Sequence, residues 1–181
     1  MIYVGDYPGG ASVRGVQVVV VMGVSGVGKT TVATGLAAAL GWSYAEGDAL
    51  HPEANVAKMA AGVPLTDEDR WPWLAKIADW LADHAASGGV IPCSSLRRSY
   101  RDRLRQGAPD VWFLHVDVDR ETILKRVSER KGHFMPATLV DSQFATLEPL
   151  GADEAGAPID GTQTPEEIVD EARRRLNSDH G

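Results

Sequence analysis

Hydrophobic residues alternate along the chain between short unbroken runs and longer segments of helical spacing. Val18–Val21 is a β-branched run, which is typical of a strand buried on both faces of a parallel sheet. After a glycine-rich turn, Val32, Leu36 and Leu40 recur at helical spacing. Gly41 follows the last of them and is placed to end the helix. The pattern predicts a strand, a loop and a helix in that order.

The same alternation continues toward the C-terminus. It predicts further strands at 43–45, 90–93, 111–116 and 158–159, and helices at 72–86, 96–105, 119–130 and from 165 onward. Asp119 is placed to cap one helix, and Thr164 to Glu167 has the pattern of a capping box that begins another. We therefore predict an α/β fold, a parallel sheet of about five strands covered by helices on both faces.

The domain organisation is predicted to be simple. No repeat or change of composition indicates a second domain, so residues 16–181 are assigned to one domain. Pro8, Gly9 and Gly10 indicate a flexible leader over residues 1–15.

Composition narrows the class of protein. The chain has 181 residues, of which 44% are hydrophobic, enough for a full core. Its 18 basic and 25 acidic residues give a net charge of −7, which argues against nucleic-acid binding. The single cysteine, Cys93, excludes an intramolecular disulfide and fits a reducing compartment. No signal peptide is visible, and no apolar run approaches the ~18 residues of a membrane span, so we expect a cytoplasmic protein with no membrane partner.

The turn after the first strand, GVSGVGKT, fits the phosphate-binding loop pattern in every fixed position. Its glycines allow successive backbone N–H groups to point at phosphate oxygens. Lys29 adds a positive charge for the β and γ phosphates, and the Thr30 hydroxyl is a candidate Mg²⁺ ligand. The residues predicted to bind ATP here are Gly23, Ser25, Gly26, Val27, Gly28, Lys29, Thr30 and Thr31.

A phosphate-binding loop does not by itself identify a reaction. A GTPase would also need an Asn-Lys-x-Asp element to recognise guanine, and the chain contains no Asn-Lys pair. The third predicted strand ends in Pro92–Ser95, without the acid that many ATPases use to hold magnesium. How the Mg²⁺ shell is completed stays open at this point.

A candidate acceptor site follows the second predicted strand. In a parallel sheet Asp48 lies at the carboxyl end, beside the phosphate loop, where its carboxylate can meet an acceptor hydroxyl. Pro52 is suited to the first turn of a new helix, and His51, Asn55 and Lys58 fall on one face of it. Solvated surface is the favoured interpretation for Asn55 and Lys58 alone. The apolar positions elsewhere on this helix are Val56, Met59, Ala60 and Val63.

Six segments between Val19 and Asp160 together resemble the gluconokinases, small P-loop kinases related to shikimate and nucleoside monophosphate kinases. They are GVSGVGKT, GDALHPEANVAKM, PLTDEDRWPWL, CSSLRRSYRDRLR, RKGHFMP and LVDSQFATLEP. The resemblance implies phosphorylation of D-gluconate to 6-phospho-D-gluconate by ATP with Mg²⁺. It also implies a substrate-binding insert at about 51–87, a lid at about 130–146 and a homodimer.

The resemblance gives expected roles to individual residues. Lys29, Asp48, Arg126 and Arg130 are the expected catalytic residues, with Asp48 as the base and Arg126 also binding the nucleotide. Arg126 and Arg130 are four residues apart, so they share a helix face and can both reach the phosphates when the lid closes. His133, within RKGHF, is expected to touch the substrate.

Further substrate contacts are expected from Asp48, His51, Arg70, Arg97, His133 and Gln143. Arg70 and Arg97 are placed near the substrate, because a guanidinium grips two carboxylate oxygens at once. The other arginines between Arg98 and Arg105 are expected on the surface, and Gln143 is expected to bond a sugar hydroxyl. Glu46 departs from the Asp-Gly-Asp often seen in the family, which leaves its part in holding Mg²⁺ open.

Two alternatives remain. One is a kinase for another small hydroxy acid such as shikimate. The other is a nucleotide-dependent regulatory or nucleic-acid-binding protein, which would require a guanine element or a basic surface that the sequence does not show.

Overall fold

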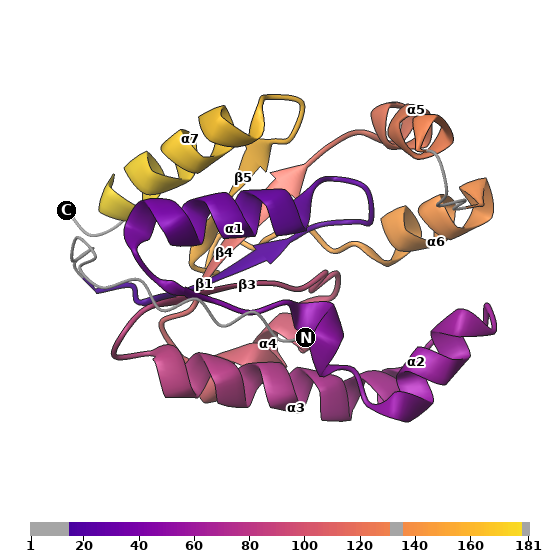
Figure 1. Ribbon diagram of the computed structural model, residues 1–181, viewed down its shortest axis with the longest axis horizontal. Coiled ribbons are helices and arrows are strands. Elements are labelled where there is room, and N and C mark those ends of the chain that lie inside the picture. The colour runs from indigo at the N-terminus through magenta and orange to yellow at the C-terminus, as the bar shows by residue number, and fades with distance from the viewer. Residues whose placement is uncertain (1–14, 131–135, 179–181) are drawn as a thin grey trace.

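The computed structural model describes residues 15–130 and 136–178 (Figure 1). The predicted leader lies outside these residues except for Gly15, and so does His133. Five parallel strands form one sheet in the order β2-β3-β1-β4-β5, which confirms the predicted α/β fold. The strands are β1 (Val18–Met22), β2 (Ser43–Tyr44), β3 (Gly89–Pro92), β4 (Trp112–Asp117) and β5 (Gly156–Asp160).

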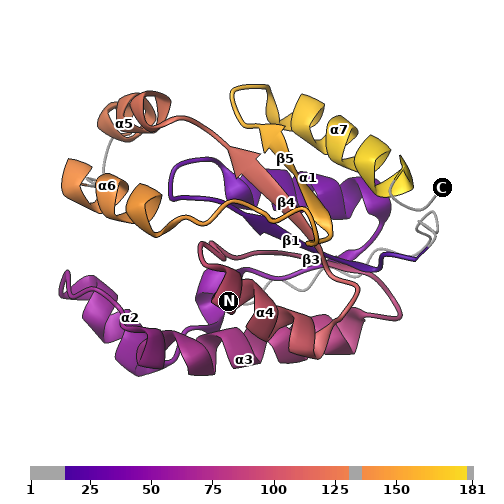
Figure 2. The same cartoon turned by 180° about the vertical axis from the view of Figure 1, so that it is seen from behind.

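Helices cover both faces of this sheet (Figures 1 and 2). One face carries α1 (Lys29–Leu40) and α7 (Pro165–Ser178), and the other carries α3 (Asp67–His84) and α4 (Arg98–Gly107). Beyond the carboxyl ends of the strands lie the short 3₁₀ helix η1 (Gly47–Leu50), α2 (Glu53–Ala60), α5 (Arg120–Glu129) and α6 (Ala137–Thr146). Among the described helices, none is long and apolar enough to cross a membrane.

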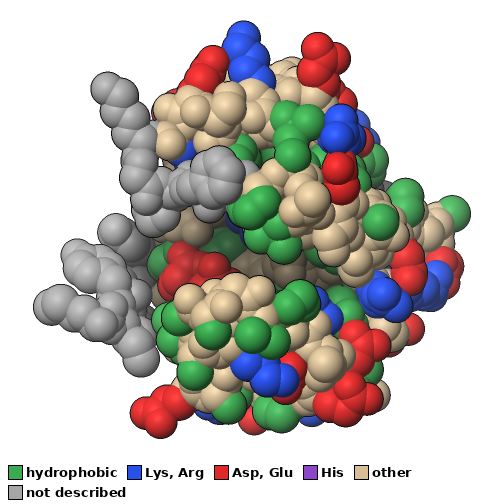
Figure 3. All heavy atoms as spheres, turned by 90° about the vertical axis from the view of Figure 1, so that its right-hand side faces the viewer, with side chains coloured by type: hydrophobic (Ala, Val, Ile, Leu, Met, Phe, Trp, Pro, Cys, Tyr) green, Lys and Arg blue, Asp and Glu red, His purple; other side chains and the backbone are tan. Residues whose placement is uncertain are grey.

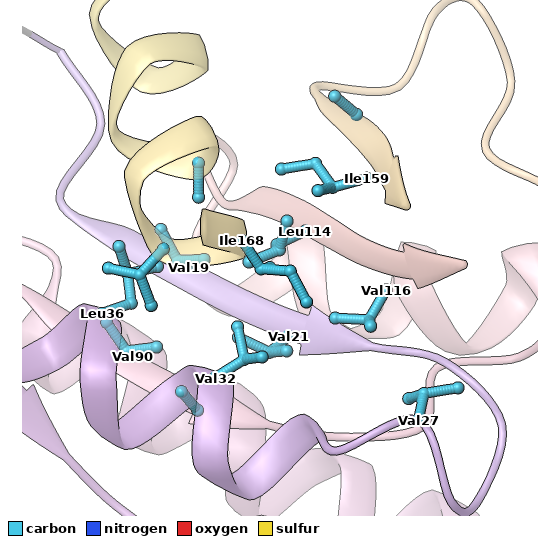
Figure 4. Close-up of a cluster of buried hydrophobic side chains, with 14 of the residues drawn as sticks. Val19, Val21, Val27, Val32, Leu36, Val90, Leu114, Val116, Ile159 and Ile168 are labelled. Atoms are coloured by element: carbon cyan, nitrogen blue, oxygen red, sulfur yellow. The ribbon is translucent and has the colours of Figure 1, made fainter. Parts of the chain in front are cut away.

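Two apolar cores lie on opposite faces of the sheet, because successive residues of β1 point to opposite sides. Val19 and Val21 pack with Leu36 of α1 and Ile168 of α7 (Figure 4). On the other face, Val20 packs in the cluster that contains the apolar residues of α3 and α4. Every residue of β1 is at most 2% exposed, as expected for a central parallel strand.

The helix ends follow the predicted capping chemistry in most places. Gly41 ends α1 with φ 66°, a left-handed conformation that glycine adopts at no steric cost. The Asp119 carboxylate accepts a bond from Thr122 N at 2.8 Å, and Thr164 and Glu167 form the predicted capping box.

One predicted boundary is wrong: α3 begins at Asp67, five residues before the predicted start at Pro72. Thr66 and Asp69 form a reciprocal capping box, in which Asp69 N donates to Thr66 Oγ1 and Thr66 N donates to the Asp69 carboxylate. The helix therefore starts at this cap, and Pro72 lies inside it, where it removes one N–H donor.

Candidate active site

Three loops meet at the carboxyl ends of β1, β2 and β3. Gly23 N, in the phosphate loop, donates to Ser94 O at 3.2 Å, which ties this loop to the segment after β3. Gly47 lies so close to the same segment that a Cβ at this position would be 2.0 Å from Pro92 O. Ser95 has φ 48°, a left-handed conformation that is uncommon outside glycine. The loops that are predicted to bind the donor and the acceptor thus share one packed edge.

The phosphate loop has the backbone that its sequence predicts. Gly26 and Gly28 have φ near 90°, where a side chain would be strained. Gly28 caps α1 without a side-chain bond to the first turn, so those N–H groups stay available to an anion. Lys29 Nζ donates to Gly23 O at 2.9 Å and to Val24 O at 3.1 Å. Burial lowers the pKa of Lys29, while the negative charges of Asp48 and Glu46 oppose this change.

Glu46 connects the second strand to the phosphate loop. Thr30 Oγ1 donates to Glu46 Oε2 at 3.0 Å, and Tyr44 Oη donates to the same oxygen at 2.7 Å. Burial and the contact with Glu46 raise the pKa of Tyr44, so the phenol keeps its proton. The longer side chain of glutamate therefore still reaches the threonine that was predicted to bind Mg²⁺.

These oxygens fit Mg²⁺, which prefers hydroxyl and carboxylate ligands and usually takes only one or two from the protein. Thr30 and Glu46 would be the protein's contribution. Among the described residues there is no cluster of three His, Cys, Asp or Glu side chains that could hold a metal. The rest of the shell would then come from phosphate oxygens and water.

The acceptor side is built around η1 and the start of α3. Asp48 lies in η1 with an exposed side chain, and its charge acts on Lys29. The His51 ring stacks on the Trp73 indole at 4.0 Å between centroids with planes 16° apart. Trp73 Nε1 donates to Gly47 O at 2.8 Å, which fixes the indole beneath the loop.

The predicted solvated face of α2 is instead directed toward α3. Asn55 is 3% exposed, and its Nδ2 donates to Asp69 O at 2.8 Å. Lys58 Nζ pairs with the Asp69 carboxylate at 2.7 Å. Surface solvation is therefore wrong for Asn55, and the apolar Val56 and Met59 are the exposed side chains, at 51% and 45%. The start of α3 supplies polar partners to α2 that the periodicity of α2 alone does not reveal.

The arginines near the acceptor site divide into different environments. Arg70 Nη1 donates to Tyr100 Oη at 3.2 Å and lies 3.6 Å from Asp67. Arg97 is exposed and precedes α4 as its N-cap. Arg101, which was predicted on the surface, is 0% exposed because the Glu154 carboxylate pairs with it in the interior.

A cavity of about 360 Å³ lies against the phosphate loop and is lined in part by Gly26, Val27 and Gly28. Arg126 and Arg130 both line it, but they do not share a helix face as predicted, because α5 ends at Glu129 and Arg130 caps it with an extended backbone. Arg126 Nη2 donates to Gly161 O at 2.8 Å, in the loop between β5 and α7. This loop was not predicted to be part of the site, although its position after the fifth predicted strand could have indicated it. The remaining lining residues are Thr31, Val32, Glu129, Gly161, Gln163, Pro165 and Ile168.

Helix α6 contacts the phosphate loop through Gln143. Its amide accepts a bond from Ser25 N at 2.6 Å and donates to Ser25 Oγ at 2.9 Å. Gln143 was predicted to bond a sugar hydroxyl, and in the structure both polar atoms of its amide bond the loop instead. Figure 3 looks onto this end of the molecule and shows a hollow between the part that carries α5 and α6 and the part that carries α2.

Comparison with known proteins gives a family for this arrangement. Residues 18–150 match a family model described as an AAA domain. A gluconokinase of Gluconobacter oxydans is 51% identical over 162 residues, covering 88% of this chain and 91% of the relative. The chain belongs to the gluconokinase family. The thermosensitive gluconokinase of Escherichia coli is 50% identical over 137 residues, covering 75% of this chain and 73% of the relative.

Solved structures agree with this assignment. The crystal structure of a gluconokinase from Sinorhizobium meliloti is 44% identical, with a TM-score of 0.83 over 90% of this chain and 92% of that one. A shikimate kinase from Aquifex aeolicus, at 15% identity and a TM-score of 0.59 over 90% and 97% of the two chains, shares the fold. The family and the P-loop kinase fold predicted from the sequence are confirmed.

The structure brings together most of the residues that were predicted for the site. Lys29, Thr30 and Asp48 lie along the shared edge of the loops. Arg126 and Arg130 line the cavity that also contacts the phosphate loop. The roles of these residues stay predictions. Three further residues contact the site, namely Tyr44 and Trp73, which were not predicted there, and Asn55, which was predicted to face solvent.

Proposed function

We propose that the protein phosphorylates D-gluconate to 6-phospho-D-gluconate with ATP. The observation that carries the proposal is the shared edge, where the phosphate loop bonds Ser94 O and the loop that carries Asp48 packs on Pro92 O. A phosphoryl donor and a hydroxyl acceptor need such an arrangement, because the two reacting oxygens must approach one phosphorus in line. Relatives that carry the name gluconokinase support the choice of acceptor.

The proposed catalytic residues have separate roles. Asp48 orients the acceptor hydroxyl and takes its proton late in the transfer. Lys29, Arg126 and Arg130 place positive charge around the transferring group. Thr30 and Glu46 would hold Mg²⁺, which when bound neutralises phosphate charge.

The acceptor is held by a second group of residues. Arg70 and Arg97 are proposed to bind its carboxylate, since both lie on the acceptor side and Arg97 is exposed. His51 is proposed to contact a sugar oxygen. His133 and Gln143 complete the set expected from the family, although both polar atoms of the Gln143 amide bond Ser25 in this structure. The family resemblance also supports a homodimer in the cytoplasm, which sedimentation and cell fractionation would test.

An acceptor screen tests the function directly. The purified protein is incubated with ATP, Mg²⁺ and one of gluconate, shikimate, other sugar acids or AMP, and ADP release is followed. Gluconate should give the highest kcat/KM. A higher value for shikimate or AMP would contradict the proposal and favour the alternative kinases.

A further inference from the structure

The His51 ring is fixed by its neighbours on two sides. Its face stacks on Trp73, which is 4% exposed and bonded to Gly47 O. Its Nδ1 atom lies 3.2 Å from Asn55 Nδ2. Stacking sets the plane of the imidazole, and the bond at Nδ1 sets its rotation within that plane. The ring is therefore held in one orientation at the edge of the acceptor site.

The bond to Asn55 determines where the imidazole carries its proton. An amide nitrogen only donates, so Nδ1 of His51 must accept and carry no hydrogen. The orientation of the amide is fixed independently, because the same Nδ2 also donates to the carbonyl oxygen of Asp69 at 2.8 Å. A neutral His51 therefore carries its proton on Nε2.

The partner that orients Asn55 is itself held in place. The Asp69 carboxylate receives bonds from Thr66 N at 2.9 Å and from Lys58 Nζ at 2.7 Å. Asn55 thus bonds to the first turn of α3, whose position the capping box fixes. Asn55 is 3% exposed, so water has little access to compete for its amide.

The other edge of the ring is available to a ligand. In the parts of the chain that the structure describes, no group bonds to His51 Nε2. Burial lowers the pKa of His51, Arg70 lowers it further, and Asp48 opposes them. The ring thus lies within the influence of both the proposed base and a proposed carboxylate ligand, and its neutral form is favoured.

We propose that Asn55 is a positioning residue that holds His51 as an Nε2–H donor, and that this N–H bonds an oxygen of the sugar acid. The bond from His51 to the sugar acid rests on the proposed function. An Nε2–H group can bond hydroxyl or carboxylate oxygen, whereas the other tautomer would present a bare nitrogen and repel a carboxylate. Asn55 needs no contact with the substrate to have this effect.

The tautomer is tested on the ligand-free protein by ¹⁵N NMR of histidine-labelled samples. The chain has five histidines, and His51→Gln identifies the resonances of His51 by their disappearance. We expect the proton on Nε2 in the wild type. Asn55→Asp should move it to Nδ1, since a carboxylate only accepts, and Asn55→Ala should give a mixture of the two forms. A proton on Nδ1 in the wild type would overturn the proposal.

The contact with substrate is tested by rescue. Glutamine places its amide nitrogen near the position of imidazole Nε2, whereas asparagine is too short. His51→Gln should therefore keep KM for gluconate within about threefold of wild type, and His51→Asn should raise it about tenfold, the effect of one lost hydrogen bond. Equal KM values for the two variants would overturn the substrate contact.

A matched control separates proton placement from docking of the helix. Lys58→Met removes the other bond between α2 and Asp69 without touching His51. We expect Asn55→Asp to raise KM for gluconate about tenfold and Lys58→Met by less than threefold. Equal increases would show that Asn55 acts only by holding α2. If the wild type phosphorylated no sugar acid, the proposed function would fail, while the NMR measurement would still decide the tautomer.

Discussion

Replacing Glu154 by glutamine should destabilise the protein strongly. Both oxygens of Glu154 bond to Arg101, at 2.7 Å to Nε and 3.0 Å to Nη2, and Arg105 also contacts the carboxylate. Arg101 in turn donates to Ser95 O at 2.9 Å, beside the phosphate loop. The Glu154 and Arg101 side chains are 1% and 0% exposed, so glutamine would leave a buried cation without its counter-ion.

The pKa of Glu154 gives the size of the effect. Burial alone would raise it, but bonds from Arg101, Gly151 N and Arg105 outweigh burial and lower it from 4.5 to about 2. That change corresponds to roughly 3 kcal/mol of stability, in line with the ~3–5 kcal/mol lost when one partner of a buried pair is removed. Because the folded pKa is the lower one, the stabilisation is present above pH 4.5 and is lost as the pH falls toward about 2.

Urea denaturation followed by tryptophan fluorescence measures this difference. At pH 7 Glu154→Gln should unfold with about 3 kcal/mol less free energy than the wild type, and the gap should narrow between pH 4.5 and 3. Asp153→Asn is the matched control, since Asp153 pairs with Arg98 but its side chain is 66% exposed, and we expect a much smaller change. A loss in Glu154→Gln no larger than in the control, or one that is independent of pH, would refute the reasoning.

Three further predictions concern the site. Asp48→Asn should lower kcat by about 10²- to 10⁴-fold with little change in gluconate binding, whereas a kcat within threefold of wild type would make Asp48 structural. Lys29→Ala should cut turnover severely and Arg130→Ala less so, because Arg126 lines the same cavity; near-normal kcat in both would exclude the phosphate clamp. Tyr44→Phe removes one bond to Glu46 and should weaken Mn²⁺ binding to the ADP complex several-fold by electron paramagnetic resonance; unchanged binding would exclude a role for Tyr44 in holding the metal.

The parts of the fold that could be predicted from the sequence are those that local chemistry determines. The β-branched run of β1, the glycine after α1 and the capping box before α7 each specify a structure within a few residues. The phosphate loop could be predicted for the same reason, because its glycines and Lys29 determine the conformation of the backbone next to them. The position of Asp48 beside the phosphate loop could also be predicted, because the carboxyl ends of parallel strands lie at the same edge of a sheet.

The errors arose where the deciding partner is distant in the chain. Arg101 has the charge of a surface residue, and only Glu154, 53 positions later, makes its burial favourable. Asn55 was assigned to solvent because the carbonyl that it bonds belongs to Asp69 on another helix. Pro72 was predicted as the helix start because proline suits the first turn of a helix. The capping box of Thr66 and Asp69 is the stronger start signal, and the helix begins there.

Gly47 imposes a mechanical limit on how the enzyme can move. A methyl group at this position would have to occupy the space of the Pro92 carbonyl oxygen, so the chain before Asp48 and the end of β3 touch backbone to backbone. Such a contact contains no side chain that could change rotamer and let the two segments slide. Any closure of the hollow must then come from the helices around it. The acceptor loop and the phosphate loop would move together as one rigid body. Altered acceptor preference is accordingly easier to engineer in α2 and α3 than at the strand ends.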